Sequence, residues 1–309
     1  MTRALLIASR SASAAVDEVP TAEPGDGQVR VRVEAASING IDAAAAAGYL
    51  WDMLPHEFPV VLGRDFAGTV DAVGEGVSAL AVGDRVAGVI TAMALGAGAI
   101  TETLTFPAGS LTAVPDSVSS TQAAAAGLAG LTARALVGAL ELGDDDIVLV
   151  SGASGGVGAF AVQLAAETGA CVIATARPDA ADFVTDLGAQ GTVDYTGDLA
   201  AGVAKAAPDG ITAVIHAAGD APALAALLPA GGRLASALGA TNEAVGRDDI
   251  TVTGIQAAGS EHYLGQVLAQ VADGTLVSPV GAAYPLDEAA DALAAFGGHK
   301  HGKLVVTVG

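Results

Sequence analysis

The chain has 309 residues, of which 52% are apolar and 4% aromatic, and its 34 acidic and 13 basic residues give a net charge of −21. This charge disfavours nucleic acid and anionic membranes as partners, while the length suffices for two domains. Gly, Asp or Arg interrupts the apolar stretches before the roughly 18 residues that a membrane span needs, and the first residues read as a strand rather than a signal peptide, so we expect a cytoplasmic protein.

Short apolar runs separated by glycine-rich turns fill the first 115 residues, a pattern typical of strands. The predicted strands are Ala4–Ile7, Val29–Ala35, Val60–Val73, Asp84–Ile90, Ile100–Phe106 and Leu111–Val114. A helix is predicted over Asn39–Ala47, where alanine dominates. We therefore predict a mostly β domain over residues 1–118.

The pattern changes at Ser120, where helices begin to alternate with short apolar strands. This alternation predicts a doubly wound parallel sheet, which we place in residues 119–260. Cys171, the sole cysteine, falls in such a strand and is interpreted as a buried small apolar residue. The predicted strands are Ile147–Val150, Cys171–Ala176, Thr192–Val193, Ala213–His216, Gly232–Ala237 and Thr251–Ile255.

The last part of the chain, residues 261–309, is predicted to return to the β domain. Helices are expected from His262 to Ala272 and over Leu286–Phe296, and strands over Val280–Tyr284 and Lys303–Val308. The fold class predicted for the whole chain is therefore α/β, with one mostly β domain and one parallel-sheet domain.

A glycine-rich turn follows the predicted strand that begins at Ile147. Ala153, Gly155 and Gly158 occupy the three positions of a G-x-G-x-x-G/A pattern, with Ser154, Gly156 and Val157 between them. Helical spacing and a second strand follow within about 30 residues, as in nucleotide-binding βαβ units. Because such a turn lets backbone N–H groups approach a pyrophosphate, the pattern predicts a dinucleotide site.

Several further motifs, in their order and spacing, resemble the medium-chain dehydrogenase/reductase superfamily over essentially the whole chain. Within it, the chain is most similar to the zinc-independent quinone oxidoreductase branch. That resemblance implies a GroES-like β domain and a Rossmann domain that bind NADPH. Besides the glycine-rich turn, the motifs are Ile38-Asn39-Gly40-Ile41-Asp42, Leu62-Gly63-Arg64-Asp65-Phe66-Ala67-Gly68-Thr69-Val70, Val82-Gly83-Asp84-Arg85-Val86, Gly130-Leu131-Thr132-Ala133 and Gly302-Lys303-Leu304-Val305-Val306.

Zinc ligands are missing from the positions where the resemblance would place them. Superfamily members with catalytic zinc have a Cys near Asn39 and a His-Glu pair where this chain has Arg64 and Asp65, and a catalytic zinc needs three protein ligands. The family's structural zinc loop needs four cysteines, and the chain has one. We expect an enzyme without metal, because no ligand spacing connects His56, His216, His262, His299 and His301.

Arg177 decides the predicted cofactor. Selectivity for NAD would require an acidic residue at the end of the strand after the glycine turn, where this chain has Thr175-Ala176-Arg177. A guanidinium suits the 2′-phosphate of NADPH; the alternative is an exposed loop arginine beside Asp179. The resemblance also assigns Tyr195 to this phosphate, with packing at the sheet edge as the alternative.

The resemblance assigns further cofactor contacts. Thr132 would bond the nicotinamide carboxamide, or else cap a helix, and Ala218, Gly239 and Lys303 would line the same cofactor. His216 stands where the family commonly has an Asp, and it is either a ribose contact or a buried histidine with its hydrogen bonds satisfied.

The candidate catalytic residues are Asn39, Tyr49 and Arg64, all in the β domain. Asn39 and Tyr49 could donate hydrogen bonds to an acceptor carbonyl as charge develops on its oxygen. For Arg64 the alternative is a structural ion pair with Asp42. Trp51 belongs either to a lid or to the core.

The preferred function is an NADPH-dependent reductase of quinones or α,β-unsaturated carbonyls, enoyl reductases included, because the cofactor carries the chemistry. A catalytically silent NADPH-binding redox sensor is the first alternative and a zinc-type alcohol dehydrogenase the second. A homodimer is expected, paired through the apolar segment Ile250–Ala258 at a sheet edge.

Overall fold

The computed structural model describes residues 1–257, 261–298 and 300–309, which form two compact units. Met1–Leu128 and Ala258–Gly309 form the first unit, and Ala129–Ala257 forms the second. The first limit lies inside a helix that the sequence pattern placed wholly in the second domain. The second predicted limit, at residue 260, lies outside the described residues, as do Ala258 of the proposed dimer edge and His299.

The first unit is built on two sheets. A three-stranded antiparallel sheet has the order β2 (Ala15–Val19), β1 (Thr2–Ile7), β4 (Val60–Val61). The larger sheet follows the order β15 (Val280–Pro285), β16 (Lys303–Thr307), β3 (Gln28–Ser37), β5 (Asp65–Val73), β6 (Arg85–Val89), β8 (Thr112–Ala113), with β7 (Thr103–Pro107) also paired to β3.

Two strands of this unit differ from the sequence prediction. The expected strand Val60–Val73 divides into β4 and β5 because the chain turns at Gly63, whose φ is +95°. β2 was not predicted, since its sequence Ala-Val-Asp-Glu-Val is partly exposed and has no clear alternation.

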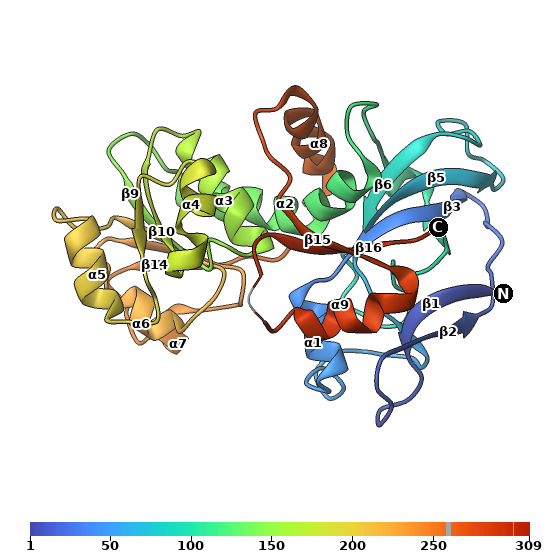
Figure 1. Ribbon diagram of the computed structural model, residues 1–309, viewed down its shortest axis with the longest axis horizontal. Coiled ribbons are helices and arrows are strands. Elements are labelled where there is room, and N and C mark those ends of the chain that lie inside the picture. The colour runs from blue at the N-terminus through green and yellow to red at the C-terminus, as the bar shows by residue number, and fades with distance from the viewer. Residues whose placement is uncertain (258–260, 299) are drawn as a thin grey trace. The chain divides into compact units, whose positions relative to one another are not determined.

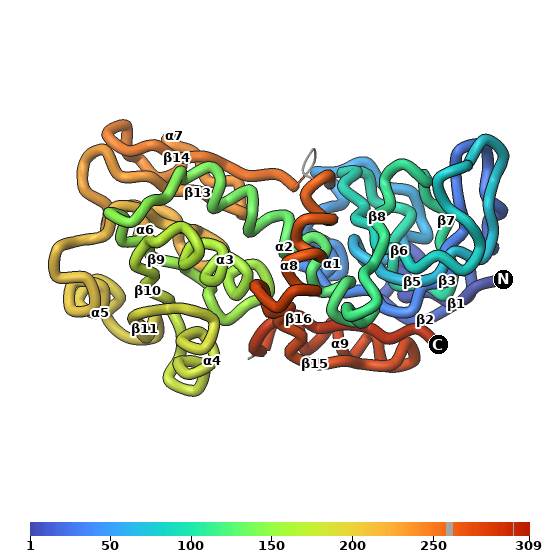
Figure 2. Tube along the Cα trace, turned by 90° about the horizontal axis from the view of Figure 1, so that it is seen from above, coloured from blue at the N-terminus to red at the C-terminus, as the bar shows by residue number. Residues whose placement is uncertain are grey.

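The C-terminal segment lies in the sheet of the first unit. β16 pairs antiparallel with β3, with Val305 opposite Ser37, and parallel with β15. Figures 1 and 2 show this strand in red beside the blue of β3. The helices of this unit are α1 (Gly40–Ala46), α8 (Leu264–Asp273) and α9 (Ala289–Ala295).

The second unit is a six-stranded parallel sheet with helices around it (Figure 1), and it confirms the predicted α/β class. Its order is β11 (Gly191–Val193), β10 (Cys171–Thr175), β9 (Ile147–Ser151), β12 (Ala213–His216), β13 (Arg233–Ser236), β14 (Thr251–Gly254). Its helices are α3 (Gly156–Ala166), α4 (Ala181–Asp186), α5 (Leu199–Ala206), α6 (Ala221–Ala225) and α7 (Asn242–Val245).

The strand order of this sheet reverses between β9 and β12. In open parallel sheets, ligands bind beyond the carboxyl ends of the strands at such a switch point. Leu149 and Val214, from these two strands, are fully buried, as expected for a sheet covered on both faces.

Helix α2 (Ser120–Leu140) contains the limit between the units and a kink at Gly127, whose ψ is −108°. The expectation that every apolar stretch would end short of a membrane span was wrong for α2. By length and composition alone, α2 is long and apolar enough to cross a membrane, because Gly127, Arg134 and Gly138 do not lower its hydropathy far enough to prevent this. However, 67% of the tested window is buried inside the structure, as in the core helix of a globular protein.

Candidate functional site

The glycine-rich turn is held by the ends of two neighbouring strands. Gly152, with φ +77°, donates from its N–H to Thr175 Oγ1 over 3.0 Å. Ser151 Oγ donates to the carbonyl oxygen of Ala218 over 2.6 Å. The turn after β9 is thus fixed against the ends of β10 and β12, on the side of the sheet where nucleotides bind.

Close packing makes glycine necessary at Gly158. A Cβ there would lie 2.1 Å from the carbonyl oxygen of Gly152 and 2.6 Å from Ala153 Cα. Gly155 caps α3, so the N–H groups of the residues that begin the helix have no acceptor within it. These N–H groups and the helix dipole favour an anion, and the arrangement fits the pyrophosphate of a dinucleotide.

Arg177 and Tyr195 lie at one corner of the sheet. Each stands two residues beyond the paired residues Thr175 and Val193 of the adjacent strands β10 and β11. Arg177 Nε is 3.5 Å from Asp179 Oδ1 and has no hydrogen-bond partner among the described residues. Tyr195 is 49% exposed. The arginine is therefore anchored weakly enough to turn toward a phosphate.

Asp194 adds a second carboxylate to this corner. The hydrogen bonds that it accepts from the backbone N–H and hydroxyl of Thr196 lower its pKa, and the charge of Arg177 contributes to the same shift. Asp179 and Asp194 therefore both compete with a phosphate for Arg177.

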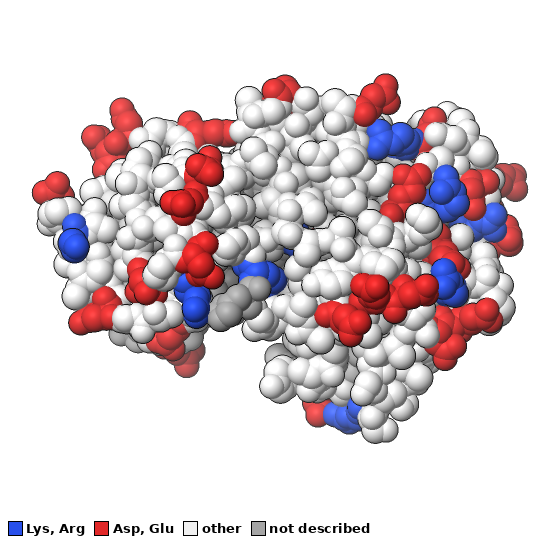
Figure 3. All heavy atoms as spheres, in the orientation of Figure 1, with Lys and Arg blue, Asp and Glu red and all other residues white. Residues whose placement is uncertain are grey.

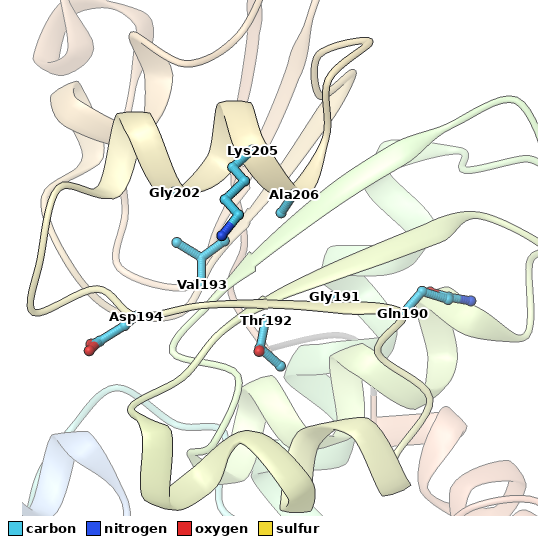
Figure 4. A pocket seen from close by; sticks show the side chains of 8 residues that line it. All are labelled: Gln190, Gly191, Thr192, Val193, Asp194, Gly202, Lys205 and Ala206. Carbon is cyan, nitrogen blue, oxygen red and sulfur yellow. The ribbon is translucent and has the colours of Figure 1, made fainter.

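An open pocket of about 500 Å³ lies between β11 and α5. In Figure 4, Lys205 extends from α5 toward Val193, whereas Asp194 and Gln190 point in other directions. Because no set of polar side chains converges on this pocket, we assign it no ligand.

His216 is buried, and both of its ring nitrogens have partners. Nε2 lies 3.1 Å from the carbonyl oxygen of Gly219, and Nδ1 lies 2.9 Å from Ser236 Oγ. Since a carbonyl only accepts, Nε2 carries the hydrogen, and the serine hydroxyl donates to Nδ1. Ser236 Oγ also accepts from the N–H groups on either side of Gly239, at Leu238 and Ala240. His216 thus holds loops in place, which agrees with the buried alternative.

Thr132 lies inside α2, beyond the kink at Gly127, and not at the N-terminus of the helix. The kink divides α2 into two helical segments, and Thr132 lies near the start of the second, in agreement with the prediction that it stands near the beginning of a helix.

A buried polar network occupies the first unit, where β3, α1, β5 and β16 meet. It comprises Ser37, Asn39, Asp42, Asp65 and Lys303, each no more than 6% exposed. Asp65 Oδ1 accepts from the backbone N–H of Ser37 at 3.2 Å and from its hydroxyl at 2.5 Å. Its Oδ2 accepts from the N–H of Leu128 at 3.0 Å, just after the kink of α2. Sequence reasoning missed the roles of Ser37 and Asp65.

Lys303 was predicted to contact the cofactor, and the structure places it inside this network. Its Nζ donates to the carbonyl oxygen of Ile38 at 2.8 Å and to Asn39 Oδ1 at 2.6 Å. Burial lowers its pKa, while the charges of Asp65 and Asp42 oppose that shift. The lysine ties β16 to the start of α1.

Asn39 and Tyr49, the two predicted carbonyl donors, lie in different surroundings. Asn39 Nδ2 donates to the carbonyl oxygen of Ser37 at 3.1 Å and to Asp65 Oδ1 at 3.2 Å, so both amide hydrogens are used. Tyr49 is 74% exposed on the segment after α1. Trp51 is 5% exposed and packs its ring against His56 and Phe58, so it belongs to the core.

Asp42 fixes the start of α1 against the turn before β5. Its Oδ2 accepts from the N–H of Asn39 and its Oδ1 from the N–H of Gly63, both at 2.8 Å. Burial raises its pKa to about 6, although both backbone hydrogen bonds oppose the shift. Among the described residues no ion pair joins Asp42 to Arg64, and the hydrogen bonds to the carboxylate oxygens of Asp42 come from the backbone.

Arg64 lies beside this network and is 4% exposed. Its Nη1 donates to the carbonyl oxygen of Ala92 at 2.6 Å, while Nη2 is buried and has no hydrogen-bond partner within the described part of the chain. Burial lowers the pKa of Arg64, and the nearby charge of Asp42 opposes that shift. Of the three candidate catalytic residues, Arg64 is the one with a buried donor to spare.

The donor set does not fit a catalytic zinc. An amide (Asn39) and a guanidinium (Arg64) stand where metal ligands would be required, the ammonium of Lys303 hydrogen-bonds the amide, and Asp65 already accepts hydrogen bonds on both oxygens. A divalent cation would meet two positive charges and too few ligands. Within residues 1–257, 261–298 and 300–309, no group of three His, Cys, Asp or Glu residues is placed to hold a metal.

Comparisons with known proteins cover both units. The alcohol dehydrogenase GroES-like domain family matches residues 25–116, and the zinc-binding dehydrogenase family matches residues 187–306. A crystal structure of an NAD-dependent alcohol dehydrogenase is 31% identical, covers 99% of this chain and 100% of its own, and has a TM-score of 0.87. The chain belongs to the medium-chain dehydrogenase/reductase superfamily. This confirms the predicted family.

Quinone oxidoreductases and reductases are among its superfamily relatives. A chloroplast envelope quinone oxidoreductase homolog from Arabidopsis thaliana is 36% identical over 66% of this chain, which spans 64% of that protein's length. A 2-haloacrylate reductase from Burkholderia is 33% identical over 58% of this chain and 54% of its own.

Two further solved structures resemble this superfamily member. The CurK enoyl reductase is 26% identical, covers 99% of both chains and has a TM-score of 0.83. A mycobacterial protein complexed with NADPH is 28% identical, covers 99% of this chain and 100% of its own, and has a TM-score of 0.85.

Proposed function

We propose that this chain is an oxidoreductase that uses NADPH to reduce a quinone or an α,β-unsaturated carbonyl compound. The observation that carries the proposal is the turn at Gly152–Gly158, where helix α3 begins and where a Cβ at Gly158 would lie 2.1 Å from the carbonyl oxygen of Gly152. Similarity to quinone oxidoreductase and enoyl reductase proteins supports the acceptor class.

The chemistry asked of the protein is modest. A bound nicotinamide supplies a hydride, and the protein binds, orients and polarises the acceptor. The turn and α3 bind the anionic part of the cofactor, while the buried polar network gives the first unit a rigid polar centre. No step requires a metal, so we expect dialysis against a chelator to leave activity unchanged. Loss of activity, restored by zinc, would revive the zinc-type alcohol dehydrogenase reading.

NADPH is proposed over NADH because β10 ends without a carboxylate and Arg177 follows it. Replacing Arg177 by Asp should raise the Michaelis constant for NADPH at least ~10-fold and change that for NADH little, because only NADPH carries the 2′-phosphate. Steady-state kinetics with both cofactors measure this difference. Equal effects on both would reject the assignment.

A turnover screen tests the function as a whole. We expect purified protein to oxidise NADPH in the presence of quinones or enones. The loss of absorbance at the nicotinamide band measures this oxidation. NADPH binding without oxidation across quinones, enones and aldehydes would instead favour the redox sensor. That alternative is kept because Asn39 has no free amide hydrogen and Tyr49 is exposed.

We further propose a cytoplasmic homodimer that pairs through strand β14 and the residues after it. β14 is a terminal strand in the strand order of its sheet, and such strands can pair with a second copy. Replacing Val252, which is partly buried in this strand, by Lys should convert the dimer to a monomer in sedimentation measurements. A wild-type monomer at assay concentration would contradict the proposal.

A further inference from the structure

We propose that Arg64 Nη2 donates the hydrogen bond that stabilises negative charge on the acceptor oxygen. We also propose that the acceptor is a neutral conjugated ketone or quinone and not an α,β-unsaturated carboxylate. This inference rests on the proposed reductase function and names the substrate class of the same site.

The first argument is the unused donor itself. Nη2 belongs to a side chain that is 4% exposed, and it has no hydrogen-bond partner among the described residues. Leaving a buried charged donor unsatisfied is costly, and such groups in native proteins call for a partner that the bare chain does not supply. An oxygen atom of a ligand is the matching chemistry, since a guanidinium only donates.

The second argument is that Arg64 is held in place. Its carbonyl oxygen accepts from the N–H of Ile90 at 2.6 Å, and its Nη1 donates to the carbonyl oxygen of Ala92 at 2.6 Å. The residue is therefore fixed by backbone and side chain to one short segment. A donor fixed before the reaction stabilises developing charge without reorganisation.

The third argument is that neighbouring donors are committed elsewhere. Both amide hydrogens of Asn39 are used within the network, and Lys303 donates to Ile38 and Asn39. The hydrogen bonds given for Asp42 come from the backbone N–H groups of Asn39 and Gly63 and not from Arg64. Lys303 uses two of its three hydrogens in these bonds, so Arg64 Nη2 is the buried donor atom at this place that has no hydrogen-bond partner among the described residues.

Charge balance identifies the acceptor class. Asp42, Arg64, Asp65 and Lys303 are each no more than 5% exposed, and their two negative and two positive charges cancel. A carboxylate substrate would add an uncompensated negative charge to this buried site, which is costly. A neutral ketone or quinone would keep the balance when it binds.

During the reaction, negative charge would develop on the acceptor oxygen that Arg64 Nη2 hydrogen-bonds. A bound nicotinamide would supply a hydride that forms the new C–H bond at the β-carbon, while the electron pair of the C=C bond shifts toward the carbonyl. The carbonyl oxygen becomes an enolate oxygen, which accepts from Nη2. In an enone a solvent proton then adds to the α-carbon; in a quinone the solvent proton adds to the enolate oxygen, and the carbon that received the hydride passes a proton to the second carbonyl oxygen, which gives the hydroquinone. Because this hydrogen bond strengthens as charge develops, it favours the transition state over the bound substrate.

The test compares two neutral acceptors, methyl vinyl ketone and 1,4-benzoquinone, with acrylate, using NADPH and the full chain. We expect kcat/KM of the wild type for acrylate to be at least ~100-fold below that for the ketone. Arg64→Gln should lower kcat for both neutral acceptors by about 100-fold, with little change in KM, as for loss of one oxyanion donor. Arg64→Lys should not restore kcat, because one ammonium cannot replace two separated guanidinium nitrogens.

Arg32→Gln is the matched control, since Arg32 is also in the first unit and its side chain is 57% exposed. Its kinetics should equal those of the wild type. Melting curves report whether each variant folds, and binding of the unreactive ketone cyclohexanone, followed by ligand NMR, gives a readout independent of turnover. We expect Arg64→Gln to weaken this binding at most about threefold, because the ground state uses the hydrogen bond less.

Each outcome bears on a different claim. Unchanged kcat in folded Arg64→Gln would overturn the role of Arg64 and leave the reductase function standing. Equal wild-type turnover of acrylate and ketone would overturn the acceptor class, and this comparison needs no variant, so it holds even where variants do not fold. Absence of turnover with every acceptor would instead refute the proposed function.

Discussion

Asp42 illustrates how a single buried side chain makes stability depend on pH. Its pKa is raised to about 6 in the folded chain, above the ordinary value of 3.8, and burial is the main cause. The folded state therefore favours the protonated acid. Stability from this group is fully present below the ordinary value and is lost as pH rises through about 6.

We predict that acidification from pH 7.5 to 5 raises the unfolding free energy through Asp42 by about 1 kcal/mol. Asp42→Asn should remove this increment, because an amide does not titrate. The measurement is chemical denaturation of wild type and variant at both pH values. Groups with lowered pKa values, such as Glu34 and Asp146, make the folded state less stable as the pH falls. They do so equally in the wild type and in Asp42→Asn, so their effect cancels when the two proteins are compared.

Asp26→Asn serves as the control, since Asp26 is exposed. It should keep the pH dependence of the wild type. If Asp42→Asn keeps it too, the raised pKa of Asp42 is wrong.

The strand, turn and helix from Ile147 to Ala166 act as one element, because the backbone at Gly158 is packed too closely against Gly152 to admit a side chain there. We predict that Gly158→Ala lowers both stability and NADPH affinity, since its Cβ would lie 2.1 Å from the carbonyl oxygen of Gly152. The backbone must move, and the N–H groups that face the pyrophosphate move with it. Thermal melting and calorimetric titration with NADPH measure the two effects.

Gly138→Ala is the matched control, because Gly138 is also helical and a Cβ there meets nothing within 4 Å. It should stabilise the protein by about 0.5 to 1 kcal/mol, as alanine does in a helix interior. Comparable losses in both variants would mean that the close approach at Gly158 is not what selects glycine.

The elements and the roles of side chains were predictable to different extents. Strand and helix alternation from Ile147 onward is a local signal, so the parallel sheet followed from it. Hydrogen bonds of the catalytic candidates are not local: Asn39 meets Asp65, 26 positions away, and Lys303, 264 positions away. The motif Gly63-Arg64-Asp65 marked the place, but only the fold shows that Asn39 has no hydrogen to give and that Arg64 does.

For the molecule as a whole, the net charge of −21 opposes an anionic cofactor. The second unit alone carries 15 acidic and 5 basic residues among Ala129–Ala257. Figure 3 shows acidic side chains spread over the visible face of each unit. The proposed cofactor NADPH would therefore approach through a repulsive field, and local groups such as Arg177 would act once it has arrived.

We predict that added salt speeds NADPH association. Raising NaCl from about 10 to 150 mM shortens the Debye length from roughly 30 to 8 Å, which screens the repulsion at a distance. Stopped-flow fluorescence should show the association rate constant rising, and dissociation also accelerating, because salt weakens the contact with Arg177. Arg177→Gln should dissociate faster while its association rate keeps the same dependence on salt. An association rate that falls with salt would show that a basic surface guides the cofactor, contrary to the charge distribution.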